Sequence, residues 1–264
     1  MTLFRKSALS GALGLDGEAP HNGPVIRQAG EGGLLVEFGE TLDDRVNNAA
    51  HAFDRRLQEQ PFAGLIETAP TIRSVLVRFD PLAVAPQDVK TRLADLYNER
   101  DWLAAGPPHN RSLWRVPVLY GGTHGPDLDA VADALGMDPM AAVEAHAAVR
   151  QRVYMLGFAP GFAYLGRLPE IWNLPRLTMI KPEIPPGSLC IAVRQTALCS
   201  TAIPTGWHWI GQTPFRSFSI DRDPPFLIEP GDEMAFEPVD AAAFARLSDA
   251  AALGRPIGCW EILP

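Results

Sequence analysis

The chain of 264 residues has few lysines and no excess of positive charge. Lys6, Lys90 and Lys181 are the only lysines, so arginines supply the other 20 of 23 basic residues, against 31 acidic residues and a net charge of −8. Proteins that bind nucleic acid use basic side chains to neutralise phosphates. The charge therefore argues against nucleic acid as a partner. A composition of 47% hydrophobic and 20% charged residues is that of a folded globular protein.

Long hydrophobic runs and closely paired cysteines are also missing. No run approaches the roughly 18 apolar residues of a membrane-spanning helix, and no hydrophobic signal segment follows Arg5 and Lys6. We therefore predict a cytoplasmic protein that does not bind membranes. Cys190, Cys199 and Cys259 lack the close spacing of zinc and redox sites, so we expect buried free thiols and no metal site.

Composition divides the chain into three parts. Residues 1–23 contain mainly small residues and predict a disordered leader. The Gly-Pro-Pro stretch at 106–108 is the strongest candidate boundary between domains. We therefore predict an N-terminal α/β domain over residues 24–108 and a second domain over residues 109–264.

The first of these domains alternates strand and helix patterns. Alternating apolar residues predict strands at 34–38, 65–69 and 75–79. Thr41 and Asp44 resemble a capping box before one helix, and Pro86 fits the first turn of another. The order of these elements is typical of a small α/β layer.

The second domain changes from helices to short strands. We expect a strand at 114–120, helices at 126–135 and 138–150, a last helix from Asp240, and a closing strand at 259–262. Between 153 and 238, Pro and Gly interrupt short apolar runs every eight to twelve residues. This punctuation predicts an all-β barrel or sandwich.

The most unusual segment runs from Gly157 to Pro169, with the sequence GFAPGFAYLGRLP. It matches neither a phosphate-binding P-loop nor a dinucleotide-binding fingerprint, and the chain has no ATP-binding signature of its own. Pro160 and Gly161 suit a type II turn, which can present backbone N–H groups to an anion or a carbonyl. A barrel corner at which glycine lets an aromatic ring such as Phe162 approach is the alternative.

Four polar side chains interrupt otherwise apolar strands: Arg194, Gln195, Thr196 and His208. Burial without a partner would cost each about 1–3 kcal/mol, so they need partners in the chain or a ligand. The Arg194 guanidinium suits a carboxylate or phosphate, and a structural ion pair is an equal alternative. For His208, which follows Gly206 and Trp207, a packed barrel residue is the commoner role and a catalytic base the rarer one.

Several long motifs in the same order resemble one known family. They are GGTHGPDL at 121–128, the 157–169 segment, PPGSLCIA at 185–192, Gln195-Thr196, GWHWIGQTP at 206–214 and PPFLIEPGDEMAFEPV at 224–239. The chain resembles the family of the 5-oxoprolinase B subunit, allophanate hydrolase subunit 1 and the sporulation kinase inhibitor. The resemblance implies an α+β fold: a small N-terminal α/β domain of ferredoxin-like type, then a cyclophilin-like β-barrel with flanking helices.

The resemblance also implies a function that needs partners. Family members act with a second carboxyltransferase-like subunit, of the same type as the 5-oxoprolinase C subunit or allophanate hydrolase subunit 2. With a third subunit, they use ATP to open 5-oxo-L-proline to L-glutamate. An unactivated lactam resists hydrolysis, and phosphorylation of its oxygen creates a leaving group. Half of a urea carboxylase system and an inhibitor of a sensor histidine kinase are the alternatives.

The resemblance guides the choice of site residues. We predict Arg194, Lys181 and His208 as catalytic, Lys181 because it keeps a basic position of the family. The predicted substrate-binding residues are Pro160, Gly161, Phe162, Gln195, Thr196, Gly206 and Trp207. The chain departs from the family pattern at Val193, Cys199, Thr205 and Gln212. The family usually has glycine at the position of Val193, and the loss of a glycine there can close a pocket.

Overall fold

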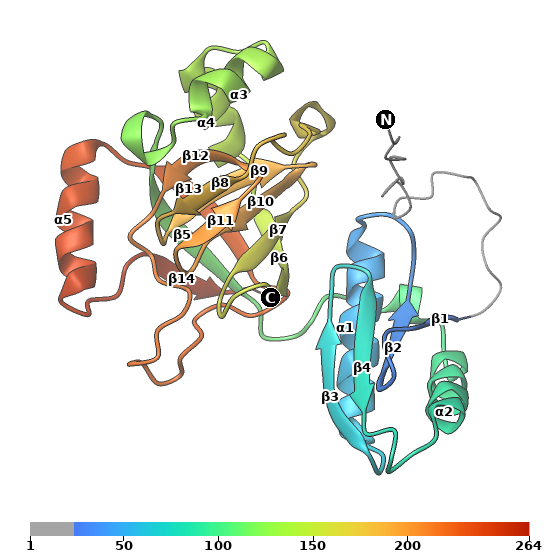
Figure 1. The fold of residues 1–264 in the computed structure, drawn as a ribbon. Helices are drawn as coiled ribbons and strands as arrows, with labels where there is room; N and C mark the ends of the chain where they lie inside the picture. Colours follow the sequence, from blue (N-terminus) through green and yellow to red (C-terminus); the bar gives the residue numbers. More distant parts are fainter. Residues whose placement is uncertain (1–23, 264) are drawn as a thin grey trace, which may run out of the picture.

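The computed structural model describes residues 24–263, and the predicted leader at 1–23 lies outside them. One large cluster of buried hydrophobic side chains includes Leu34, Phe53 and Leu93, and another includes Val116 and Leu165. Figure 1 shows the small sheet with its helices beside a larger barrel. The stretch 106–108 falls in the connection between them. Its use as a domain boundary stays a prediction.

The N-terminal layer is a four-stranded antiparallel sheet with helices. Its elements are β1 (Val25–Gln28), β2 (Gly33–Glu37), α1 (Asp44–Glu59), β3 (Leu65–Pro70), β4 (Ser74–Phe79), α2 (Pro86–Asn98) and the 3-10 helix η1 (Trp102–Ala104). The strand order is β1-β2-β4-β3, so β2-α1-β3 forms a split βαβ unit with β4 between its strands. The edge strand β1, which sequence reasoning missed, precedes this unit. The ferredoxin-like description stays a prediction.

The helix starts follow local capping chemistry. Asp43, not Thr41, caps α1, because its extended backbone lets the carboxylate accept a hydrogen bond from the Arg45 N–H at 2.8 Å. The expected capping box of Thr41 and Asp44 is therefore wrong. Pro86 is the first residue of α2, as predicted.

The larger body is a closed barrel, which confirms the all-β prediction for residues 153–238. Its strands are β5 (Ser112–Tyr120), β6 (Gln151–Leu156), β7 (Ala163–Gly166), β9 (Ser188–Ala192), β10 (Gln195–Leu198), β12 (His208–Gln212) and β13 (Glu233–Pro238). They follow the order β12-β9-β10-β7-β6-β13-β5, and the pairing of Gly211 with Tyr120 closes the ring. The predicted last strand, β14 (Cys259–Ile262), pairs with the first half of β5. The expectation of three buried thiols is wrong for Cys259, because all four residues of this edge strand are exposed, whereas Cys190 and Cys199 are buried.

Helices and a small sheet cover the barrel. The remaining elements are α3 (Leu128–Leu135), α4 (Pro139–Ala147), α5 (Ala241–Ala252), the 3-10 helices η2 (Gly122–His124) and η3 (Glu170–Trp172), and the strands β8 (Lys181–Ile184) and β11 (Ile203–Thr205). Helices α3 and α4 lie together at one end of the barrel (Figure 1). Helix α3 begins two residues later than expected, and α4 ends three residues earlier. Within residues 24–263, no helix is long and apolar enough to cross a membrane.

A polar network lies inside the barrel around His146 of α4. The Nδ1 atom of His146 is 2.9 Å from the Tyr120 hydroxyl, and Nε2 is 2.9 Å from the Thr196 hydroxyl and 3.2 Å from Gln151 Nε2. Burial lowers the pKa of His146 to about 3, so the imidazole is neutral. A neutral ring protonated at Nδ1 satisfies all three contacts, since Nδ1 donates to Tyr120 and Nε2 accepts from the other two.

This buried histidine should make stability depend on pH. Because the pKa of His146 is about 3 in the folded protein and has its ordinary value of 6.5 in the unfolded chain, the unfolded state binds more protons below pH 6.5. The folded protein therefore loses roughly 2 kcal/mol of stability between pH 7 and pH 5 through this residue. In His146→Gln that part of the pH dependence should vanish, as measured by urea unfolding at each pH. His109→Gln, at an exposed position, should keep the wild-type dependence; an unchanged slope in His146→Gln would contradict the assignment.

Candidate functional site

The loop before β7 forms the turn expected at Pro160 and Gly161. The Phe162 N–H donates to the Ala159 carbonyl at 3.0 Å, and Gly161 has a φ of 70°. A side chain at Gly161 would place its Cβ 2.4 Å from Cβ of Phe218, so both conformation and space require glycine there. The carbonyls of Pro160 and Gly161 accept hydrogen bonds from the hydroxyls of Ser200 and Ser217. Hydrogen bonds to its backbone carbonyls thus fix the conformation of the loop.

Two of the predicted substrate-binding residues, Phe162 and Trp207, meet in one apolar cluster. This cluster lies on the outer face of β9 and β10 and contains Cys190 and Cys199. The Gly206 carbonyl beside it accepts a hydrogen bond from the Leu177 N–H at 2.6 Å. These contacts put the aromatic rings in a packed layer under β8 and β11.

Arg194 lies in the two-residue turn between β9 and β10. Val193 and Arg194 have φ values of 45° and 65°, as in a type I′ hairpin. The Val193 N–H donates to the Leu174 carbonyl at 2.8 Å, and Arg194 Nε donates to the Leu168 carbonyl at 3.0 Å. The Arg194 guanidinium also pairs with Glu170, whose side chain is 73% exposed. Arg194 therefore forms a structural ion pair at the surface.

Lys181 and His208 lie on neighbouring segments and have separate partners. Lys181 Nζ is 3.0 Å from Asp127, whose other carboxylate oxygen accepts the Trp209 N–H at 2.7 Å. His208 Nε2 is 2.9 Å from the Pro175 carbonyl. Among residues 24–263, no hydrogen bond or ion pair joins any two of Lys181, Arg194 and His208. Their grouping into one catalytic site stays a prediction.

Gln195 and its neighbour Thr196 differ in whether their buried polar atoms have hydrogen-bond partners. Thr196 is fully buried and bonds His146 inside the barrel. Gln195 is 7% exposed and its buried Nε2 has no hydrogen-bond partner within the described part of the chain. Of the four polar residues expected to need partners, Gln195 alone keeps a buried polar atom without one.

Three of the four departures from the family pattern are accommodated. Gln212 Nε2 donates to the Pro186 carbonyl at 3.0 Å, and the Thr205 hydroxyl accepts from the Trp207 N–H at 3.1 Å. Cys199 lies beside Cys190 in the outer cluster, and burial is the main cause that raises the pKa of the Cys190 thiol. Val193 is the costly departure, because a β-branched residue there has positive φ.

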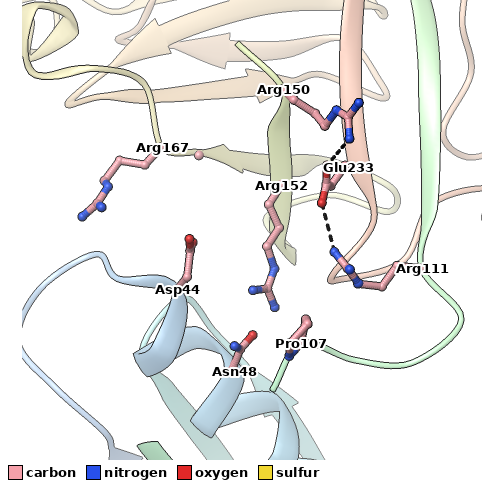
Figure 2. A pocket seen from close by; sticks show the side chains of 9 residues that line it. Asp44, Asn48, Pro107, Arg111, Arg150, Arg152, Arg167 and Glu233 are labelled. Atoms are coloured by element: carbon pink, nitrogen blue, oxygen red, sulfur yellow. Dashed lines mark hydrogen bonds and ion pairs between the residues drawn. The ribbon is translucent and has the colours of Figure 1, made fainter. Parts of the chain in front are cut away.

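A second candidate site, which sequence reasoning missed, lies between α1 and the barrel (Figure 2). It is a cavity of about 430 Å³ lined by Asp44, Asn48, Pro107, Arg111, Arg150, Arg152, Gly166, Arg167 and Glu233. Glu233 pairs with Arg111 at 2.9 Å and with Arg150 at 3.6 Å. Arg152 extends from β6 toward the start of α1 in Figure 2, and its Nε and NH2 atoms are buried without a hydrogen-bond partner among residues 24–263. We call this the arginine cavity.

Burial sets the electrostatics of the arginine cavity. It lowers the pKa of Arg152, although the nearby Asp44 carboxylate opposes the shift. Burial also raises the pKa of Tyr154, and the hydrogen bond from its hydroxyl to Asp44 adds to that rise. The only sequence signal was the pair Arg150 and Arg152 at the start of a strand, and it does not show that other arginines gather there.

The comparisons with known proteins agree with the motifs. Residues 24–228 match the family described as carboxyltransferase domain, subdomain C and D. The chain is 35% identical over 225 residues to the 5-oxoprolinase B subunit of Bacillus subtilis, covering 80% of this chain and 91% of that protein. It is 36% identical over 209 residues to the protein of the same name from Escherichia coli, covering 79% and 93%.

Two solved structures share the fold. The crystal structure of TTHA0988 is 28% identical, with a TM-score of 0.67 over 82% of this chain, and this chain spans 40% of its length. The urea carboxylase of Kluyveromyces lactis has a TM-score of 0.74 at 17% identity, covering 91% of this chain and 24% of that one. At that identity the similarity shows the fold alone.

The strained turn gives a stability prediction. Val193→Gly should raise the free energy of unfolding by about 1 kcal/mol, because removal of roughly 1–3 kcal/mol of backbone strain outweighs the 0.5–1 kcal/mol entropy cost of glycine. Urea unfolding measures the change. Ile66→Gly is the matched control, since Ile66 is β-branched, 56% exposed and in β3, where glycine should destabilise. Equal destabilisation of both variants would show that the turn carries no strain.

Proposed function

This chain belongs to the carboxyltransferase family, subdomains C and D, and from that premise we propose that it is a subunit of an ATP-dependent 5-oxoprolinase complex. The observation that carries the proposal is the set of three relatives that are each named as the B subunit of 5-oxoprolinase. They are 32–36% identical and cover 70–80% of this chain and 84–93% of their own length. The reaction opens 5-oxo-L-proline to L-glutamate.

A protein named as a B subunit implies a complex with further subunits. We propose a second carboxyltransferase-like subunit and a third 5-oxoprolinase subunit as the partners, with activity only in the assembled complex. ATP belongs to that complex in this proposal. The arginine cavity does not fit a nucleotide with Mg²⁺, because Glu233 is paired with two arginines and Asp44 accepts the Tyr154 hydroxyl.

Arg194 is our candidate for the group that holds the substrate carboxylate. Hydrogen bonds to the carbonyls of Leu168 and Leu174 fix the turn, so the guanidinium has a defined position before substrate binds. The side chain of its present partner, Glu170, is 73% exposed, so breaking this ion pair leaves the carboxylate in solvent and not buried without a partner. A substrate carboxylate can therefore take the place of Glu170 on the same guanidinium.

We assign the other predicted residues supporting roles in the same proposal. In this proposal Lys181 supplies a cationic side chain and His208 a side chain that can transfer a proton. Gln195, with its buried free amide, is the substrate-binding candidate that a ligand would satisfy. Pro160, Gly161 and Phe162 form a loop whose carbonyls are held by serine hydroxyls, which leaves its conformation independent of substrate.

The function is tested by adding the two partner subunits to the purified chain and measuring ATP hydrolysis with and without 5-oxo-L-proline. We expect ATP turnover that depends on 5-oxo-L-proline and requires all subunits. In Arg194→Ala the KM for 5-oxo-L-proline should rise at least tenfold, which corresponds to about 1.4 kcal/mol of lost carboxylate binding.

The matched control removes the other half of the ion pair. Glu170→Gln frees the guanidinium, so the KM should fall or stay the same while the fold is equally perturbed. A complex that assembles and shows no substrate-dependent turnover would refute the 5-oxoprolinase assignment. Equal losses in both variants would refute the role of Arg194 and leave the overall function intact.

A further inference from the structure

We propose that the arginine cavity binds a small phosphate-bearing anion, as the free ion or a phosphate monoester, with Arg152 as its anchor. The cavity lies between the first turns of α1 and strands β6 and β7 (Figure 2), and neither Val193 nor Arg194 is among its lining residues. Binding here is a property of this chain alone. It does not depend on the proposed oxoprolinase activity.

The charges that line the cavity do not cancel. Arginines at 111, 150, 152 and 167 contribute four positive charges, and Asp44 and Glu233 contribute two negative ones. The surplus of two positive charges stands out in a chain whose net charge is −8. A phosphate carries about 1.5 to 2 negative charges near pH 7. Such an anion would therefore neutralise the cavity.

Arg152 is the group that lacks a partner. Its Nε and NH2 atoms are buried with no hydrogen-bond acceptor among the residues of the described chain. Burial of an unpaired charge is costly, and a nearby anion lowers that cost. Because Arg152 lines the cavity, an anion bound there would lie beside its guanidinium.

The surroundings of Arg152 favour a phosphate over a single carboxylate. The lining arginines come from the residue before β5, from β6 and its approach, and from the segment after β7, so positive charge borders the cavity on several sides. That arrangement suits a tetrahedral ion with more than two acceptor oxygens. Helix α1 starts at the cavity with Asp44, and the positive end of a 16-residue helix adds to the potential. The volume of about 430 Å³ also admits an organic phosphate.

The test is binding to the full, isolated chain at pH 7.5 and constant ionic strength, measured by calorimetry. The probes are inorganic phosphate, glycerol 3-phosphate and 5-oxo-L-proline, with chloride as the reference salt. We expect phosphate to bind and Arg152→Gln to weaken it at least tenfold. Arg167→Gln should weaken it severalfold; Arg167 is exposed, and its NH1 donates one hydrogen bond to the Leu42 carbonyl at 3.0 Å, so thermal unfolding of this variant is measured alongside.

Arg78→Gln is the control of equal charge change, since Arg78 pairs with the exposed Glu67 away from the cavity. Its phosphate affinity should stay within twofold of wild type. Tighter binding of glycerol 3-phosphate than of phosphate would assign a monoester, and the reverse would assign the free ion. Equal weakening in all three variants, or no binding beyond the chloride reference, would overturn the proposal. Binding of 5-oxo-L-proline alone, dependent on Arg152, would also overturn it by assigning a carboxylate.

Discussion

The position of α1 against the barrel depends on Tyr154. Its backbone carbonyl accepts hydrogen bonds from Asn47 Nδ2 at 3.1 Å and from His51 Nε2 at 2.8 Å, and its hydroxyl donates to Asp44. One fully buried residue of β6 thus holds three residues of one helix, spaced three and four positions apart along one face. Gly166 makes this possible, because a Cβ there would lie 2.5 Å from the Tyr154 ring. These contacts fix one wall of the arginine cavity against the other.

The barrel separates two chemical environments through the alternation of β9 and β10. Thr196 and Leu198 face the interior, where the Thr196 hydroxyl bonds His146, whereas Ala197 and Cys199 face the outer cluster. Alternate residues of one strand therefore contribute to the polar network inside the barrel and to the apolar layer under β8 and β11. The Arg194 turn projects from the end of these strands. Hydrogen bonds to the carbonyls of Leu168 and Leu174 hold it in place.

Local patterns explain which parts of the fold could be predicted. Pro86 at a helix start and the Pro160–Gly161 turn depend on residues adjacent in sequence, and both formed as expected. The need of Arg194 and His208 for partners was also correct, although the partners are a glutamate and a backbone carbonyl, which no pattern identifies. Strand β1 was missed because only half of its four residues are partly buried, which leaves little apolar alternation.

The arginine cavity could not be predicted, because its residues come from segments as far apart as Asp44 and Glu233. The composition nevertheless contains its physical basis. A lysine that is buried near other cations tends to lose its proton, whereas a guanidinium keeps its charge. Burial lowers the pKa of Arg152, yet the arginine starts from so high a value that it stays cationic. Arg152 must keep its charge near three other arginines, which a lysine there would not do. The four cations that line the cavity are accordingly all arginines, in a chain with only three lysines.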